Sequence, residues 1–479
     1  MQRRTWLQAC APWMASAATG GVLGLGGLAG GAHAATAPAG AAPDARFLLV
    51  FLRGGYDGLS ALVPTQRTFY DEVRKDIALP AASLRTLDAD WAMHPALAST
   101  LAPLLDRGEV AFLPYAGTPN ASRSHFETQD SIELGLGASL VAGGTRDFQT
   151  GFLNRLARQL GGRAAIGFTD QLPLALRGDL PVANVSLRAP PRPGDMAALQ
   201  AGMLAMYREH PLRDKVEAAF AVRDQVAQQL AEEAARARAA APNPVTALVT
   251  APASGGAMAM AGDNAMAGGM ANPMASPMAS PATPPAAKPP ASGMASPAVA
   301  NEMAAASRNA VLPRGFELEA RRVARLMRER YSIGFVDVGG WDTHYNQGAA
   351  TGALAGRLEE LGRGLAGFAD ELGPAAWRQT VVVVLSEFGR TVRENGTRGT
   401  DHGHGTVYWV LGGGLAGRSP VRGEQVPLTA ATLFQNRDLP VLNDYRTLLA
   451  GLWARQFGLG PAALGEVFAG VAPRDYGLL

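Results

Sequence analysis

Two short motifs in the last third of this 479-residue chain combine aspartate with histidine. They are Asp342-x-His344 and Asp401-His402-x-His404. In an extended segment, side chains two residues apart point to the same face, so Asp342 and His344 are expected to act together. Carboxylate and imidazole are ligands that suit zinc, manganese or iron. The motifs therefore predict a divalent-metal site, with these aspartates and histidines as candidate ligands.

Four consecutive residues, Ser122, Arg123, Ser124 and His125, form a second group that suits catalysis. A helix is predicted to start near Ser124, and the free N–H groups of a helix start favour a developing alkoxide. Ser124 and Ser122 are therefore candidate nucleophiles. Arg123 and His125 are candidate catalytic partners in the same turn. The alternative is structural, because Ser124 to Glu127 is also a Ser-x-x-Glu capping box.

Charged side chains also follow two apolar runs. Asp57 lies in the glycine-rich turn after residues 47–52, where backbone can approach a ligand closely. Glu387 and Arg390 follow residues 381–385, the most apolar run of the chain. Charge at the end of a central strand favours function, so Asp57 and Glu387 are predicted metal ligands and Arg390 a catalytic cation. A turn-forming aspartate and a structural Glu–Arg ion pair are the alternatives.

Short apolar runs separated by helical patterns have to position these side chains. The runs predicted as buried strands are 47–52, 110–115, 180–187, 333–338, 381–385 and 407–411. The helical patterns include 153–160, 316–330, 354–372 and 445–457. This alternation predicts an α/β fold with a mostly parallel central sheet flanked by helices. In such sheets, ligand sites form at the carboxyl ends of the strands, which predicts one metal-assisted site for the polar groups there.

The beginning of the chain carries an export pattern. Arg3 and Arg4 precede an uncharged segment of alanine, glycine and leucine that ends in a small-residue cleavage pattern at residues 32–34. We predict a twin-arginine signal peptide over residues 1–34, with the twin-arginine translocase as a partner and the periplasm as the location. An uncleaved anchor is the alternative. The many glycines of this segment make it a poor apolar span, which disfavours an anchor. After cleavage, no stable membrane span is expected.

Composition narrows the function further. Cys10 is the only cysteine and lies in the predicted signal, which excludes disulfides, thiolate ligands and a cysteine nucleophile from the mature chain. The formal net charge of +2 becomes zero without Arg3 and Arg4, which gives no indication of a nucleic-acid partner. Residues 240–307 are rich in Ala, Pro, Gly, Ser and Met, and we predict a disordered insertion within a single domain of residues 35–479. The methionines leave copper(I) handling as an alternative.

Long motifs across the chain resemble those of the DUF1501 family, a group within the alkaline phosphatase and sulfatase superfamily. The motifs are residues 51–60, 122–126, 339–344, 386–391, 399–403 and 444–446. The resemblance implies an alkaline phosphatase/sulfatase-like sheet, with one or two metals and a Ser or Thr nucleophile at the strand ends. In that superfamily, metals hold a phosphate or sulfate ester while the nucleophile attacks in line.

The resemblance also implies roles by position. The matching residues are Asp57 after the first strand, Ser124 or Ser122 as the nucleophile, Asp342 with His344 as a metal cluster, and His402 or His404 as a late ligand. The chain departs from the pattern at Glu387-Phe388, where hydrolytic relatives usually carry Asp-His. This departure removes one imidazole from a two-metal arrangement, and His404 is the candidate replacement.

Two functions are consistent with these features. The leading expectation is a periplasmic metal-dependent hydrolase of phosphate or sulfate esters, in which Arg123 and Arg390 neutralise the oxyanion. The alternative is a non-catalytic envelope protein that binds an anionic glycan or an assembly partner through the same pocket. The first function predicts turnover of an ester, and the second predicts binding without turnover.

Overall fold

A computed structural model describes residues 44–137, 149–187, 193–214, 314–417 and 419–479, with single positions between 216 and 310. The predicted signal peptide, residues 1–34, lies outside the described residues. The predicted insertion, residues 240–307, also lies outside them except for Ser307. The elements below belong to the compact unit Thr36–Leu479.

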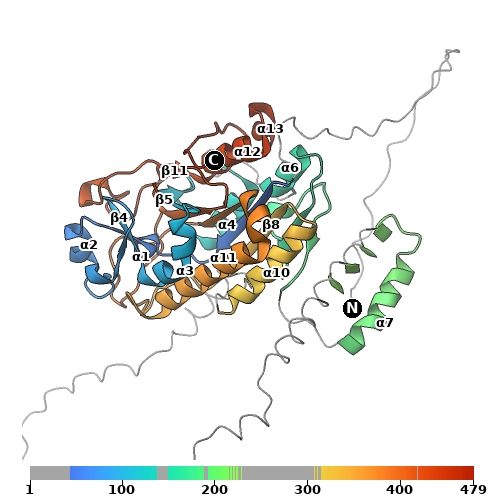
Figure 1. The fold of residues 1–479 in the computed structure, drawn as a ribbon, viewed down its shortest axis with the longest axis horizontal. Coiled ribbons are helices and arrows are strands. Elements are labelled where there is room, and N and C mark those ends of the chain that lie inside the picture. Colours follow the sequence, from blue (N-terminus) through green and yellow to red (C-terminus); the bar gives the residue numbers. More distant parts are fainter. Residues whose placement is uncertain are drawn as a thin grey trace, which may run out of the picture. The chain divides into compact units, whose positions relative to one another are not determined.

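The main sheet has eight strands (Figure 1). Their bounds are β1 Arg46–Leu52, β5 Val110–Gly117, β6 Ala165–Phe168, β7 Ala183–Asn184, β8 Ile333–Val338, β9 Thr380–Ser386, β10 Thr406–Leu411 and β11 Asn443–Asp444. The order across the sheet is β11-β5-β10-β9-β1-β8-β6-β7. All neighbouring strands are parallel except at β10, which runs antiparallel to β5 and β9. The sheet is therefore mostly parallel, as the alternation of strand and helix patterns predicts.

The central strand β1 is apolar at consecutive positions because both of its faces are covered. Leu48 and Val50 pack in one hydrophobic core, and Phe47 and Leu49 pack in the other. Successive residues of a strand point to opposite faces, so a strand buried on both sides has no position left for a solvated side chain. The same reasoning explains the apolar runs of β8 and β9, which flank β1 and are buried throughout.

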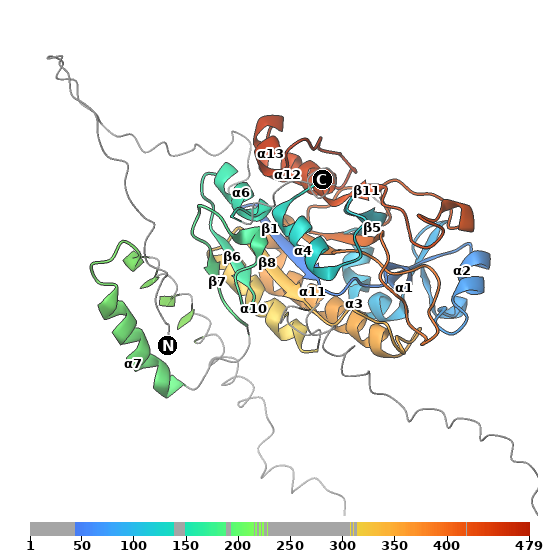
Figure 2. The ribbon, with the colours of Figure 1, turned by 180° about the vertical axis from the view of Figure 1, so that it is seen from behind.

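Helices cover both faces of this sheet (Figures 1 and 2). The described helices have the bounds α1 Gly58–Ala61, α2 Thr68–Val73, α3 Pro95–Asp106, α4 His125–Leu134, α6 Phe152–Gln159, α7 Pro193–Met206, α10 Phe316–Glu329, α11 Ala353–Arg378, α12 Tyr445–Phe457 and α13 Pro461–Val467. α3, α10 and α11 share the core that contains Leu48, whereas α6, α12 and α13 share the core that contains Phe47. Among the described helices, none has the length and apolar character that a membrane span requires.

Smaller elements complete the described chain. A three-stranded sheet has the order β2-β4-β3, with bounds β2 Leu62–Pro64, β3 Arg85–Thr86 and β4 Trp91–Met93. Single 3₁₀ turns span Ala81–Ser83, Leu174–Leu176 and Ala430–Thr432.

Three details of the sheet differ from the sequence-based expectation. Residues 180–187 contain only the two-residue strand β7, because Pro181 has no N–H to donate to a neighbouring strand. β6 and β11 are too short, at four and two residues, to form a recognisable apolar run. The antiparallel direction of β10 is also unforeseen, since an apolar run carries no information about strand direction.

Candidate metal centre

Strand direction decides which loops meet at the site. β5, β9, β1 and β8 run parallel to one another, so their carboxyl ends lie along one edge of the sheet. β10 runs the other way, so the loop before it, residues 387–405, reaches that edge. His125 begins α4 after β5, and Asp342 and His344 follow β8. His402, in the loop before β10, completes the group.

His125, Asp342, His344 and His402 form one group, the imidazole cluster. Nε2 of His402 lies 3.0 Å from Nε2 of His125 and 3.0 Å from Nε2 of His344. Oδ1 of Asp342 lies 2.9 Å from Nε2 of His344 and 3.3 Å from Nε2 of His402. The donor atoms of His125, Asp342 and His402 all lie within 4.8 Å of one another. Imidazole nitrogens and a carboxylate thus face a common centre.

The other ring nitrogen of each imidazole faces an oxygen acceptor. Nδ1 of His344 lies 3.2 Å from Oδ1 of Asp401, and Nδ1 of His402 lies 2.9 Å from the backbone carbonyl of Arg123. Nδ1 of His125 lies 2.8 Å from Oε1 of the glutamate that follows β9. Because carbonyl and carboxylate oxygens only accept hydrogen bonds, each Nδ1 carries a proton and each Nε2 turns toward the centre. Histidine ligands of metals are held in this way.

Asp342 is buried and uses its two oxygens differently. Oδ1 accepts a hydrogen bond from Nη2 of Arg390. Oδ2 is buried, accepts no hydrogen bond from the part of the chain that the structure describes, and lies 3.6 Å from Nε2 of His125. A buried carboxylate oxygen without a partner is costly. A cation between this oxygen and the imidazole nitrogens would satisfy it, so the residues present fit a divalent metal.

The charge state of the cluster follows from its burial and its carboxylates. Burial alone would lower the pKa of His125, but the neighbouring carboxylates of Asp342 and Glu387 raise this pKa to about 9. Burial lowers the pKa of His402. Burial opposes the charge on Asp342, but the histidines and Arg390 hold its pKa well below the usual range. At neutral pH, the metal-free cluster therefore carries a proton on Nε2 of His125.

Metal binding is expected to release about one proton at pH 7 and fewer as the pH approaches 9. The proton of His125 has to leave before Nε2 can bind a cation, and a pKa of about 9 keeps it in place at pH 7. Affinity for the metal is therefore expected to rise with pH up to about 9. Calorimetric titration with Zn²⁺ in buffers of different protonation enthalpy counts the protons released. Binding at pH 7 without proton release would contradict this charge state.

Glu387, a predicted ligand, lies behind His125 rather than at the centre. Its Oε1 accepts hydrogen bonds from His125, from Nε2 of Gln129 at 2.8 Å and from the backbone N–H of Gly54 at 2.8 Å. Its Oε2 accepts a hydrogen bond from Oγ of Ser386 at 2.9 Å. Burial would raise the pKa of Glu387, but these hydrogen bonds and His125 lower it to about 2. The carboxylate is fully engaged, which favours an orienting role over direct ligation.

Asp57 and His404, two further predicted ligands, also lie apart from the cluster. Both oxygens of Asp57 accept hydrogen bonds from the guanidinium of Arg74, at 2.7 and 2.9 Å, and Oδ2 also accepts one from Gln347 at 2.7 Å. The ring of His404 packs on Phe434, with centroids 4.7 Å apart, and burial lowers its pKa to about 4. Ion pairing and packing thus account for both side chains. Among the described residues, neither belongs to the group of converging donor atoms.

The two candidate nucleophiles have different surroundings. Oγ of Ser122 donates to Oε2 of Glu127 at 2.8 Å and accepts a hydrogen bond from the backbone N–H of Ser124 at 3.3 Å. Ser124 is exposed at the N-cap of α4, and its side chain caps no N–H of that helix. The capping-box alternative is therefore wrong, because Glu127 bonds to Ser122 instead. The hydroxyl of Ser124 remains accessible next to His125.

The two candidate catalytic arginines are both engaged in ion pairs. Arg390 is buried, donates to Asp342 and donates to the backbone carbonyl of Thr400 at 3.1 Å. Arg123 donates to Oδ2 of Asp438 from Nε at 3.0 Å and from Nη2 at 2.5 Å, and its side chain is 26% exposed. Arg390 is thus positioned to support Asp342, whereas Arg123 reaches the surface.

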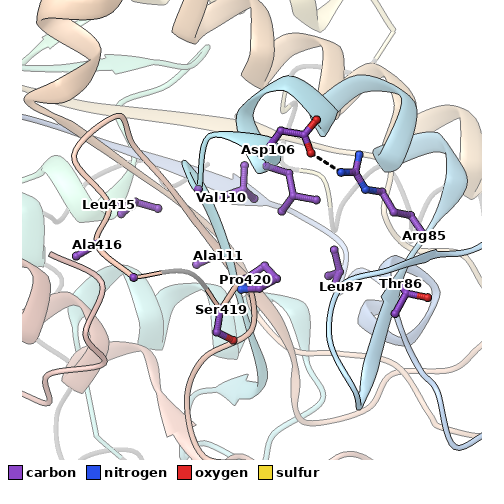
Figure 3. Close-up of a pocket in the computed structure, with 13 residues that line it drawn as sticks. Arg85, Thr86, Leu87, Asp106, Val110, Ala111, Leu415, Ala416, Ser419 and Pro420 are labelled. Carbon is purple, nitrogen blue, oxygen red and sulfur yellow. Dashed lines mark hydrogen bonds and ion pairs between the residues drawn. The ribbon is translucent and has the colours of Figure 1, made fainter.

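An open depression connects the cluster to solvent. Its lining residues are Arg123, His344, Asn395, Thr397, Asp401, His402 and Arg437. A separate hollow lies around the start of β5, the strand end opposite the cluster (Figure 3). Its charged groups, Arg85 and Asp106, form an ion pair with Nη2 and Oδ1 2.5 Å apart, and no histidine lines it. The depression beside the cluster is therefore the one of these two hollows that is lined by histidines, His344 and His402.

Two glycines allow the loops of the site to approach each other. A Cβ atom on Gly54, whose φ is +120°, would lie 2.7 Å from the backbone nitrogen of Asp342. A Cβ atom on Gly399 would lie 2.4 Å from the carbonyl carbon of His344. Any side chain at either position would push the loops apart.

Three buried residues support the site without having been predicted from the sequence. Arg53 donates to Oε1 of Gln129 at 3.0 Å, and Gln129 in turn donates to Glu387. Gln347 donates to Asp57. Arg53 directly follows β1, and a charged residue at a strand end is a sequence signal from which its role at the site could have been predicted. A single glutamine in a helix or loop carries no comparable pattern.

The comparison with known proteins identifies a family. A profile of the family described as "Protein of unknown function (DUF1501)" matches residues 44–468, a range that includes the whole imidazole cluster. No curated protein and no solved structure matches the chain. The chain therefore belongs to the DUF1501 family.

Proposed function

We propose that the protein is a periplasmic metal-dependent hydrolase of phosphate or sulfate esters. The observation that carries the proposal is the convergence of three imidazole Nε2 atoms on Asp342, whose Oδ2 is buried without a hydrogen bond in the described chain. This donor set suits zinc, manganese or iron. When bound, such an ion would polarise an ester oxygen and lower the pKa of a hydroxyl or water beside it.

The surroundings of the cluster favour one ion over two. The ring of Phe388 packs on His125 and His402, with centroids 4.8 and 5.0 Å apart, and a phenyl ring offers no ligand atom. His404, the candidate replacement, packs on Phe434 instead. The resemblance to the alkaline phosphatase and sulfatase superfamily supports ester chemistry, and we propose a one-ion version of it.

Two guanidinium groups beside the cluster could bind an anionic substrate. Arg123 and Arg437 line the open depression together with Asn395 and Thr397. The two guanidinium groups share the carboxylate of Asp438, at 2.5 and 3.7 Å, and Asp401 adds a second carboxylate to the lining. Guanidinium groups match the oxygens of phosphate and sulfate.

Ser124 is the proposed nucleophile. Its exposed hydroxyl lies at the start of α4, beside His125, and caps no N–H of the helix. Ser122 is held by Glu127 and is less available. The positive end of the helix dipole at this position favours the alkoxide that attack requires.

Export in the folded state fits a site of this kind. The Arg3-Arg4 pattern supports transport by the twin-arginine translocase, a pathway that moves folded proteins. The imidazole cluster is drawn from three separate loops and exists only after the sheet has formed. Folding before transport would let the ion be inserted in the cytoplasm.

Hydrolysis of nitrophenyl phosphate or nitrophenyl sulfate by the metal-loaded protein is expected to depend on Ser124. Ser124→Ala is expected to lower kcat by roughly 10³-fold or more, because no other hydroxyl lies free at the helix start. The metal content is expected to stay unchanged. Ser122→Ala is the matched control and is expected to keep most of the activity. Release of nitrophenolate measures each rate.

The outcomes of this experiment separate the two candidate functions. If Ser124→Ala turns over like wild type, the assignment of the nucleophile is wrong and a water molecule attacks instead. If the metal-loaded wild type hydrolyses neither ester, a non-catalytic envelope protein that binds an anionic glycan or an assembly partner is the better description.

A further inference from the structure

Gln347 is a fully buried residue in the loop that follows β8. Its Nε2 donates to Oδ2 of Asp57 at 2.7 Å and to Oγ of Ser60 at 3.2 Å. Its Oε1 accepts hydrogen bonds from the hydroxyls of Thr343 and Thr400, each at 3.0 Å. Two donors and two acceptor positions are all that an amide offers, so this side chain is fully engaged.

The carboxylate of Asp57 determines the orientation of the Gln347 amide. A carboxylate only accepts hydrogen bonds, so Nε2 of Gln347 has to face Asp57 and Oε1 has to face the two threonines. Asp57 is itself held by Arg74, whose guanidinium donates to both carboxylate oxygens. Burial opposes the charge on Asp57, but Arg74, Ser60 and Gln347 keep its pKa below the usual value. Asp57 thus anchors Gln347.

The two threonines belong to the two loops that carry the imidazole cluster. Thr343 lies between the two cluster residues that follow β8, and Thr400 lies two positions before His402. The backbone N–H of Thr400 also donates to the carbonyl of Thr343 at 3.1 Å. Oε1 of Gln347 therefore ties the loops together at the point where they meet.

We propose that Gln347 is a positioning residue of the metal centre, which fixes the separation between the loop after β8 and the loop before β10. The inference rests on the proposed function only in that the imidazole cluster binds a metal. Hydrogen bonds that hold ligands in place raise affinity, because the donor atoms are already arranged when the ion arrives. Without the tie, the distance between His344 and His402 relaxes, and affinity falls although every ligand remains.

The test is a calorimetric titration of the full-length protein with Zn²⁺. Gln347→Met keeps most of the side-chain volume, removes all four hydrogen bonds, and is expected to weaken Zn²⁺ binding by about 10- to 100-fold. Asn154→Leu is the matched control, because Asn154 is a buried amide that donates to the carbonyls of Leu176 and Leu180, away from the cluster. The control is expected to lower the thermal midpoint and leave Zn²⁺ affinity unchanged.

A second variant separates the tie from a general loss of stability. Thr400→Val keeps the branched shape and removes one hydroxyl that donates to Gln347. Alone, it is expected to weaken Zn²⁺ binding by at least about threefold. In the Gln347→Met background it is expected to have no further effect, because its partner is already gone. If Gln347→Met does not fold, Thr343→Val takes its place. Zn²⁺ affinity is then measured for Thr343→Val, for Thr400→Val and for the double variant.

The outcomes are distinguishable. A wild-type protein that does not bind Zn²⁺ overturns both the metal centre and the positioning role. Wild-type affinity in Gln347→Met overturns the positioning role alone and leaves the metal centre intact. If the effects of Gln347→Met and Thr400→Val on Zn²⁺ affinity are purely additive, the positioning role is likewise overturned and the metal centre stays intact.

Discussion

Asp342→Asn is expected to abolish tight binding of Zn²⁺ and, with it, the hydrolysis of esters. The substitution keeps the shape of the side chain but replaces one carboxylate oxygen by an N–H₂ group, which cannot ligate a cation. The negative charge at the centre of the cluster is lost as well, together with an interaction that raises the pKa of His125. We expect Zn²⁺ affinity to fall by more than the roughly 100-fold typical of residues that only support a ligand.

The matched control for this substitution is Asp444→Asn. Asp444 is the N-cap of α12, accepts a hydrogen bond from the backbone N–H of Arg446 and lies outside the cluster. Asparagine caps helices as well as aspartate does, so this variant is expected to bind Zn²⁺ like wild type. Wild-type affinity in Asp342→Asn would remove Asp342 from the metal centre.

Arg53→Met is expected to produce the largest loss of stability in the vicinity of the site. Arg53 donates to Asp337 at 2.6 Å and to Glu133 at 2.9 Å, and all three side chains are nearly inaccessible to solvent. Removing the cation leaves two buried carboxylates without a counter-charge. Breaking a buried ion pair in this way costs roughly 3–5 kcal/mol. Urea denaturation of the metal-free protein measures the change in the free energy of unfolding.

Arg85→Met is the control for this loss, because it breaks an ion pair at the surface. The side chains of Arg85 and Asp106 are 34% and 64% exposed, and such pairs contribute about 1 kcal/mol or less. If Arg53→Met were as stable as Arg85→Met, the buried hydrogen bonds that join Arg53, Gln129 and Glu387 would not stabilise the site as we infer.

The sheet could be predicted where its strands are long and apolar. β1, β8 and β9 lie close to the predicted ranges, because burial on both faces makes nearly all of their positions apolar; Asp337 in β8 is an exception. The direction of β10 depends on which neighbours it pairs with, and no local pattern records that pairing. Yet this direction brings the loop of Asp401 and His402 to the edge where the other cluster residues lie.

The site could be predicted by residue type but not by the role of each carboxylate. Asp342, His344 and His402 meet as their motifs predict. Asp57 and Glu387 lie at equivalent strand ends but do not belong to the group of converging donor atoms. The difference lies in their partners. Arg74 forms an ion pair with Asp57, whereas Gln129 and the backbone N–H of Gly54 donate hydrogen bonds to Glu387. Such partners come from other elements, so local spacing does not reveal them.

Elemental analysis of the purified protein is the most direct test of the central claim, that the imidazole cluster binds a divalent cation. We predict about one zinc, manganese or iron ion per chain in the wild type and none in Asp342→Asn, with both proteins folded. A wild type that holds no ion even after incubation with these metals, or an Asp342→Asn variant with the same metal content, would contradict it.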